Sequence, residues 1–236
     1  MLIAYPVKGK KKSIDLCQAF IEGYKRAGGC EPGAVFFGVN ESNIVDWHRV
    51  LATGSPYWYG DNAFFDATRQ RQFRFAKNRL QIDAAQQTDG KRFAALGLEV
   101  KPMRRDGHHW VVCEQSPFFV EHVAPGAKRW LEDTVTALRA TERPVVVRAW
   151  DRDKTAQMAS LPSDLTDAWG LVTHSSAAAV TALLEGVGVV VSPNSACSSI
   201  WLPDGRENLF GVLADNQWTI EELATGKAWQ WLNRTK

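Results

Sequence analysis

Residues 170–193 have the sequence GLVTHSSAAAVTALLEGVGVVVSP, and this stretch decides the expected fold. An apolar run ends at Thr173, a run of small residues follows over 175–184, and a second apolar run covers 187–191. The two apolar runs have the length of buried strands, and the segment between them has the length of a short helix. A strand, a crossover helix and a second strand predict two parallel strands of an α/β sheet.

The same alternation appears on both sides of this stretch. Strands are predicted at 2–5, 34–39 and 57–59, with helices after Ser13 and over 42–51 between them. Further strands are predicted at 70–75, 110–113 and 144–148, and further helices at 128–139 and 218–232, the last one broken near Gly226. We therefore expect an α/β protein with two Rossmann-like halves, residues 1–125 and 126–236.

Composition excludes several classes of protein. With 45% hydrophobic and 23% charged residues, the chain is not a disordered one. A net charge of +2 does not suit a chain that is basic throughout, although local clusters of lysine and arginine can attract phosphates. No apolar run approaches the length of a membrane span, and the four cysteines lack zinc-site spacing. These features predict a cytoplasmic protein with free thiols and no membrane association.

Ligands of open α/β sheets bind where the strands end. Ser175 and Ser176 follow directly after the strand that ends at Thr173, at the expected start of a helix, where free N–H groups favour phosphate. His174 is either a phosphate contact or a packing residue at the end of the strand. The alternative for the whole segment is a capped helix that packs on the sheet without any ligand.

Residues 170–193 resemble the donor-site helix of GT-B glycosyltransferases, of the type found in capsule-polysaccharide and bacterial sialyltransferase-like enzymes. The resemblance implies that Glu185 contacts the sugar or the ribose of the donor. Residues 143–148, followed by Lys154, resemble the strand and basic loop that contact the phosphates or the base, which gives Arg148 and Lys154 that role. Ala149 and Trp150 replace the His-Pro of the sialyltransferase group, which argues against a cytidine-monophosphate donor.

A narrower resemblance is to small glycosyltransferases of tailed bacteriophages. It rests on WYGDNAFF at 58–65, on Arg74 with Asn78, and on LADNQWTIEEL at 213–223 with Gly226 and Trp229. Such enzymes often decorate hydroxymethylated pyrimidines in DNA. The resemblance therefore implies that double-stranded DNA with modified pyrimidines is the acceptor.

Asp61 is the candidate general base, because an inverting transfer needs a group that takes the proton of the acceptor hydroxyl. Its alternative role is that of a turn residue after a strand. The candidate DNA contacts come from two basic segments, and they are Lys8, Lys10, Arg69, Arg71 and Arg74. Phe73 and Phe75 alternate with the arginines, which suits either a nucleic-acid backbone with extruded bases or a charged edge strand.

The sequence thus predicts a metal-independent, inverting glycosyltransferase of GT-B type with a cleft between its halves. It would use a nucleotide-sugar donor, most simply a UDP-sugar, and no bound cofactor. The favoured acceptor is a 5-hydroxymethylpyrimidine in phage DNA. The alternatives are a saccharide acceptor, a sugar-nucleotide epimerase, and a nucleotide- or DNA-binding module without catalysis.

Overall fold

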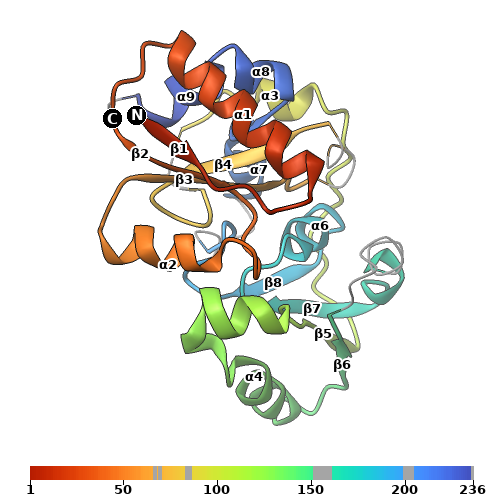
Figure 1. Ribbon diagram of the computed structural model, residues 1–236. Coiled ribbons are helices and arrows are strands. Elements are labelled where there is room, and N and C mark those ends of the chain that lie inside the picture. The colour runs from red at the N-terminus through yellow and green to blue at the C-terminus, as the bar shows by residue number, and fades with distance from the viewer. Residues whose placement is uncertain (66–67, 69–70, 83–86, 151–160, 199–204, 235–236) are drawn as a thin grey trace. The chain divides into compact units, whose positions relative to one another are not determined.

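The computed structural model of the chain describes residues 1–65, 68, 71–82, 87–150, 161–198 and 205–234 (Figure 1). The chain divides into two compact units. Unit 1 combines Met1–Arg92 with Gly211–Lys236, and unit 2 is Phe93–Phe210. The α/β class is confirmed, since unit 1 contains a mixed sheet and unit 2 a parallel one. The expected boundary at residue 125 differs from this division, because the strands on either side of it pair with each other inside unit 2.

The sheet of unit 1 has five strands in the order β1-β2-β3-β4-β9. The first three run parallel to one another, whereas β4 runs antiparallel to β3, and β9 antiparallel to β4. Their bounds are β1 Leu2–Ala4, β2 Gly33–Phe37, β3 Tyr57–Asn62, β4 Phe73–Lys77 and β9 Gln217–Trp218. The parallel strands follow chain order across the sheet, so this part of unit 1 has no reversal of strand order.

Helices cover both faces of this sheet. Figure 1 shows α1 with α8 and α9 on one side and α2 on the other. The bounds are α1 Lys11–Arg26, α2 Ile44–Ala52, α8 Ile220–Ala224 and α9 Lys227–Leu232. Along the chain, α3 Lys91–Ala94 and α7 Arg206–Asp215 each begin in one unit and end in the other. Successive side chains of a strand point to opposite faces, so an interior strand covered on both faces is apolar throughout. Strand β2 follows this rule and is buried from Ala34 to Phe37.

An aromatic cluster forms the core between α1 and the sheet. Phe20 of α1 stacks on Phe75 at 4.7 Å between ring centroids and contacts Trp58 and Trp229 at 6.2 and 6.1 Å. These residues come from both ends of the chain, and Trp229 belongs to α9. On the opposite face, Trp47 of α2 packs edge-on against Phe36 at 5.2 Å. The C-terminal segment is therefore a part of the unit 1 core.

The C-terminal segment approaches α1 closely at two glycines. A Cβ atom on Gly23 would lie 1.9 Å from the carbonyl oxygen of Leu223, so only glycine fits where α8 crosses α1. Gly226 has φ 89°, a left-handed conformation that favours glycine and ends α8 before α9 begins. The break expected near Gly226 is confirmed. Helix α8 starts with a capping box in which Thr219 and Glu222 satisfy each other's backbone N–H groups.

Unit 2 contains a fully parallel sheet in the order β6-β5-β7-β8. Its bounds are β5 His109–Cys113, β6 Val145–Arg148, β7 Ala168–Thr173 and β8 Gly188–Val191, with helices α4 Trp130–Arg139 and α6 Ala178–Leu184. After β5 the chain moves outward to β6, and it then returns to the other side of β5 for β7 and β8. The strand order therefore reverses between β5 and β7.

Three expected elements differ from the observed ones. Strand β3 continues through Asp61 to Asn62, so Asp61 lies in a strand rather than on a turn. The strand expected at 70–75 is β4, which starts at Phe73 and lies between β3 and β9, so it is not an edge strand. Helix α6 begins at Ala178, later than Ser175. None of the helices in the described residues is long and apolar enough to cross a membrane.

We expect that Phe20→Ala lowers the free energy of unfolding of unit 1 by about 3–5 kcal/mol, because it empties the centre of the aromatic cluster. Urea unfolding followed by circular dichroism measures the loss. Val45→Ala is the matched control, since Val45 is 75% exposed and should change stability by less than about 0.5 kcal/mol. An equal effect of the two variants would contradict the assignment of this core.

Candidate functional site

The first candidate site is the edge of the unit 1 sheet at which the parallel strands β1, β2 and β3 end, here called the carboxyl edge. Lys8 and Lys10 lie exposed in the loop after β1. The backbone N–H of Lys8 donates to Ser42 Oγ at 3.0 Å, which joins this loop to the one after β2. Lys12 Nζ donates to Asn62 Oδ1 at 2.7 Å, at the end of β3. The structure therefore brings the expected lysines to the edge that holds Asp61.

The second basic segment is divided by β4. In the antiparallel pairing, Phe73 lies opposite Asn62, and Lys77 lies opposite Trp58, four residues further along. Arg71, which precedes β4 and is exposed, therefore lies at the carboxyl edge. Lys77 is roughly 14 Å from Phe73, towards the opposite edge of the sheet. The segment does not form one continuous basic surface, and Arg69 lies outside the described residues.

Arg74 is buried, which corrects its expected role as an open contact to DNA. Its side chain is 11% exposed, and Nη2 donates to Asp61 Oδ2 at 2.8 Å. Nη1 donates to Gln81 Oε1, and the guanidinium lies 4.6 Å from the centroid of the Phe64 ring. A buried arginine needs such compensation, because a charge removed from water without a partner is costly. Arg74 therefore acts on Asp61 rather than on an external phosphate.

The two phenylalanines of β4 do not stack on extruded bases. Phe73 and Phe75 both belong to the hydrophobic core of unit 1. The alternative of a charged edge strand is also wrong, since β4 pairs on both sides. The alternation of arginine and phenylalanine instead reflects an interior strand that carries a buried ion pair on one face and an aromatic core on the other.

Asp61 is a fixed carboxylate that solvent can reach. Arg74 holds Oδ2, the backbone N–H of Asn62 donates to Oδ1 at 2.7 Å, and 37% of the side chain is exposed. The position within β3 makes the role of a turn residue wrong. Burial and the negative charge of Asp61 raise the pKa of the neighbouring Tyr59, so Tyr59 remains protonated and does not compete as a base. This geometry suits a general base.

The second candidate site is the carboxyl end of β5 and β7 in unit 2, where the strand order reverses. Gln115 follows β5, and its Nε2 donates to Thr173 Oγ1 at 3.0 Å. Ser175 Oγ donates to Gln115 Oε1 at 3.4 Å, so side chains link the two loops. Such a reversal is where open parallel sheets bind their ligands. We call this group, Gln115, Thr173 and Ser175, the switch-point site.

Sequence reasoning did not single out Gln115 as a site residue. The signal was present, because Gln115 stands two residues after the end of a predicted strand, just as Ser175 does. What the sequence does not reveal is that these two strands are neighbours, since 54 residues separate β5 from β7 along the chain.

His174 is 8% exposed and lies against two aromatic rings. The ring centroids of Phe119 and Trp130 are 6.3 and 6.0 Å from that of His174, both edge-on. Burial lowers the pKa of His174, so the imidazole is neutral at pH 7. Nδ1 lies 3.3 Å from Ser175 Oγ. His174 can therefore offer a hydrogen bond at the switch-point site but no positive charge to a phosphate.

The serines after β7 form a loop rather than the first turn of a helix. Ser176 Oγ accepts the backbone N–H of Ala178 at 3.2 Å, in the turn that precedes α6. Helix α6 has only seven residues, so its dipole is a weak source of phosphate binding. The expected phosphate site at a helix N-terminus is corrected to a loop whose side chains bond to one another.

Two expected donor contacts are held in ion pairs within unit 2. Arg148, at the end of β6, pairs with Asp164, and its side chain is only 9% exposed. Glu185 ends α6 and pairs with Lys101 at 2.5 Å, near the amino end of β8. Glu185 is thus at the sheet edge opposite to the switch-point site. The contacts of Arg148 and Glu185 with a donor stay predictions, and Lys154 lies outside the described residues.

Metal binding finds no support in the part of the chain that the structure describes, where no group of three or more His, Cys, Asp and Glu side chains is placed to hold an ion. The sequence does contain two acids one residue apart, Asp151 and Asp153, a spacing that can place two carboxylates on one cation. The expectation of a metal-independent reaction overlooked this pair. Both residues lie outside the described residues, so that expectation stays a prediction.

The basic character of the chain belongs to unit 1. Its two segments contain 17 lysines and arginines against 12 acids, whereas unit 2 contains 11 against 14. The small net charge of the whole chain therefore conceals one basic unit and one acidic unit. The basic unit is the one that carries Asp61 and the exposed lysines of the carboxyl edge.

Comparisons with known proteins leave the family open. No family model and no curated protein matches the chain. Among solved structures, the chain is similar to a LacI-family transcriptional regulatory protein from Corynebacterium glutamicum, at 11% identity and a TM-score of 0.30, over 99% of this chain and 92% of that one. A similarity this low carries no argument about the function of the two candidate sites.

The burial of His174 predicts a pH dependence of stability. The folded pKa lies below the unfolded value of about 6.5, so the stabilising contribution is complete above that pH and is lost as the pH falls through the folded pKa. A single proton limits the slope to ~1.4 kcal/mol per pH unit. Urea unfolding between pH 7.5 and 5.5 should show that the free energy of unfolding falls less steeply with decreasing pH in His174→Gln than in the unchanged protein. Val45→Ala, at an exposed position and without a change of any titratable group, should keep the original slope.

Proposed function

We propose that the protein is a nucleotide-sugar-dependent glycosyltransferase. Unit 2 binds the donor at the switch-point site, and unit 1 supplies Asp61 and the basic carboxyl edge for the acceptor. The GT-B architecture is part of the same proposal. The donor is a UDP-sugar, and the activity belongs in the cytoplasm, which is the host cytoplasm if a phage encodes the chain.

The observation that carries the proposal is the reversal of strand order between β5 and β7, with Gln115, Thr173 and Ser175 linked across it. Hydroxyl and amide groups at such a point suit the hydroxyls and phosphate oxygens of a nucleotide sugar. The neutral His174 beside them adds a hydrogen-bonding group without a charge. The location agrees with the resemblance to GT-B donor sites over residues 170–193.

The chemistry assigned to unit 1 is that of a general base. Asp61 takes the proton of the acceptor hydroxyl while the hydroxyl oxygen forms a bond to the anomeric carbon. The bond from that carbon to the donor phosphate breaks, and the nucleoside diphosphate leaves with the electron pair. Attack opposite to the leaving group inverts the anomeric centre. Arg74 holds the carboxylate in place during this step.

The favoured acceptor is a 5-hydroxymethylpyrimidine in double-stranded DNA. Its support comes from the basic unit 1, where Lys8, Lys10 and Arg71 are exposed at the carboxyl edge near Asp61. The phage-type resemblance adds to it, because its separate stretches gather in one sheet. Asp61 of β3 pairs with Arg74 of β4, and β4 pairs with Gln217 of β9. A saccharide acceptor remains the alternative within the same activity.

A binding module without catalysis is the second candidate function. Arg148 and Glu185, which should contact the donor, are both held in ion pairs. A module that binds a nucleotide or DNA needs the switch-point site or the basic edge but no base. The two candidates differ in what they require of Asp61.

Asp61→Asn separates these functions. The enzyme should lose about 10²–10⁴-fold in kcat, because proton transfer to a base contributes this much, while donor binding is kept. Mass spectrometry of digested nucleosides measures sugar transfer to duplex DNA that contains 5-hydroxymethylcytosine or 5-hydroxymethyluracil. Assays with Mn²⁺ and with EDTA test the role of a metal. Asp46→Asn, which removes a surface pairing to Arg49, is the control and should leave turnover unchanged.

Removing the amide of Gln115 should weaken donor binding. We expect Gln115→Ala to raise the Kd of the bound nucleotide sugar about 10-fold, the effect of one lost hydrogen bond of ~1.4 kcal/mol. Isothermal titration calorimetry over a panel of nucleotide sugars measures it. Thr166→Ala, in the same unit but before β7, should bind normally. Unchanged affinity in Gln115→Ala would remove the donor from the switch-point site.

A further inference from the structure

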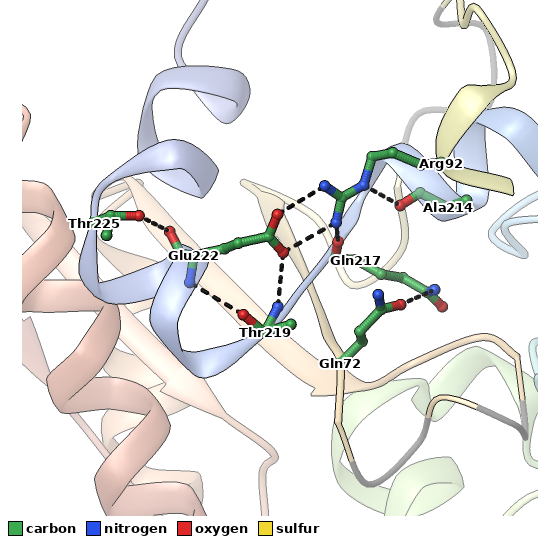
Figure 2. A network of polar contacts seen from close by, with 7 residues as sticks. All are labelled: Gln72, Arg92, Ala214, Gln217, Thr219, Glu222 and Thr225. Carbon is green, nitrogen blue, oxygen red and sulfur yellow. Dashed lines mark hydrogen bonds and ion pairs between the residues drawn. The ribbon is translucent and has the colours of Figure 1, made fainter. Parts of the chain in front are cut away.

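Gln217 of β9 is a fully buried polar side chain to which the proposed chemistry assigns no role. Its Oε1 accepts the backbone N–H of Phe64 at 2.5 Å and that of Phe65 at 3.4 Å. Its Nε2 donates to Gln72 Oε1 at 3.1 Å, as Figure 2 shows. A buried amide is costly unless its groups are satisfied, and here both ends of the amide are used.

Two partners of Gln217 lie three and four residues after the candidate base. Strand β3 ends at Asn62, so Phe64 and Phe65 have left the ladder, and their N–H groups need other acceptors. Gln217 supplies the acceptor from a segment about 150 positions later in the chain. Both phenylalanines are 1% exposed, so water cannot replace this amide. The path of the chain beyond Asp61 is therefore set by Gln217.

A continuous series of contacts joins Gln217 to Asp61. Gln217 fixes Phe64, the Phe64 ring lies under the guanidinium of Arg74, and Arg74 donates to Asp61. Gln217 also lies directly opposite Arg74 in the pairing of β4 with β9. Gln217 thus supports the ion pair of Arg74 and Asp61 in two ways. Its side chain fixes Phe64, and its backbone lies opposite that of Arg74.

A second set of contacts holds β9 itself, and Figure 2 shows these as well. Arg92 Nη2 donates to the carbonyl oxygen of Gln217 at 2.5 Å, and Nε donates to that of Ala214 at 3.2 Å. Both nitrogens Nη1 and Nη2 reach the carboxylate of Glu222, at 2.8 and 3.1 Å. Glu222 is in turn part of the capping box with Thr219. The contacts of Arg92 therefore hold Gln217 in place in addition to the contacts of Gln217 with the segment after β3.

We propose that Gln217 is a positioning residue for Asp61, which it aims at the acceptor through Phe64 and Arg74. This inference rests on the proposed function, in which Asp61 is the base. It gives the stretch LADNQWTIEEL of the C-terminal segment a role in the reaction, in addition to its role in the core.

The kinetic test compares Gln217→Met with Asn216→Leu. Asn216 is the adjacent residue, is 1% exposed, and bonds to the carbonyl oxygen of Val212 and to the indole N–H of Trp231. Both variants should lower Tm. Only Gln217→Met should lower kcat, by about 10-fold or more, because a small displacement of a reacting group has effects of this size. The KM for the donor should stay within about twofold.

A double-mutant cycle excludes a purely structural effect. In the Asp61→Asn background, Gln217→Met should cause no further loss of kcat, since the group that it positions has already lost its function. An equal loss in both backgrounds would overturn the proposal, and so would equal losses in Gln217→Met and Asn216→Leu.

A spectroscopic readout keeps this inference separate from the proposed function. The ¹³C signal of the Asp61 carboxyl group is assigned by its absence from Asp61→Asn and followed by NMR against pH. We expect its midpoint to move by ~0.5 pH unit or more in Gln217→Met and to stay in place in Asn216→Leu. An unmoved midpoint overturns the positioning role. If the unchanged protein transfers no sugar although the midpoint moves, the proposed function fails and the link from Gln217 to Asp61 stands.

Discussion

The buried guanidinium of Arg74 is the constraint on which the architecture of unit 1 depends. An arginine in the interior of a sheet is costly unless its charge is compensated. Asp61 on the neighbouring strand, Gln81 and the ring of Phe64 provide that compensation. The register of β3 against β4 is fixed by the same requirement, because a shift by one residue would turn Arg74 towards the aromatic core. The candidate base is therefore also a part of the framework.

The two sheets offer different kinds of site. The parallel sheet of unit 2 has a reversal of strand order, and its polar groups, Gln115, Thr173 and Ser175, bond across that point. The mixed sheet of unit 1 runs in chain order through β3 and presents one fixed carboxylate beside exposed lysines. A neutral, hydrogen-bonding site and a basic site with a base are suited to different partners. This difference supports the assignment of the donor to unit 2 and of the acceptor to unit 1.

The sequence predicted most of the strands, because short apolar runs favour strands. The run Val145–Arg148 forms β6 even though Val146 and Val147 are 40% and 43% exposed. The sequence predicted the loop at His174 as a site for the same reason, since the end of a strand is visible in the residue pattern. It did not predict the partners of Arg148 and Glu185. Asp164 and Lys101 lie 16 and 84 positions away, and pairing at such distances follows from packing alone.

The C-terminal segment was harder to predict from the sequence than these ion pairs. Its helical pattern was correct, but β9 has only two residues and leaves almost no periodic signal. Its place beside β4 depends on contacts such as that of Gln217 with Phe64, between residues 153 positions apart. For the same reason the sequence placed the boundary at residue 125. A unit built from both ends of a chain has no boundary that composition can reveal.

That discontinuity has a consequence for synthesis on the ribosome. Unit 2 is a continuous insertion, so all of it has been translated before Gly211 is added. Unit 1 cannot close its core until Trp218, Leu223 and Trp229 have left the exit tunnel. At about 5–20 residues per second, the first 92 residues wait roughly 7–30 s for these partners. During that interval Phe20 and Trp58 lack their contacts with Trp229, so part of the aromatic cluster of the nascent chain stays uncovered.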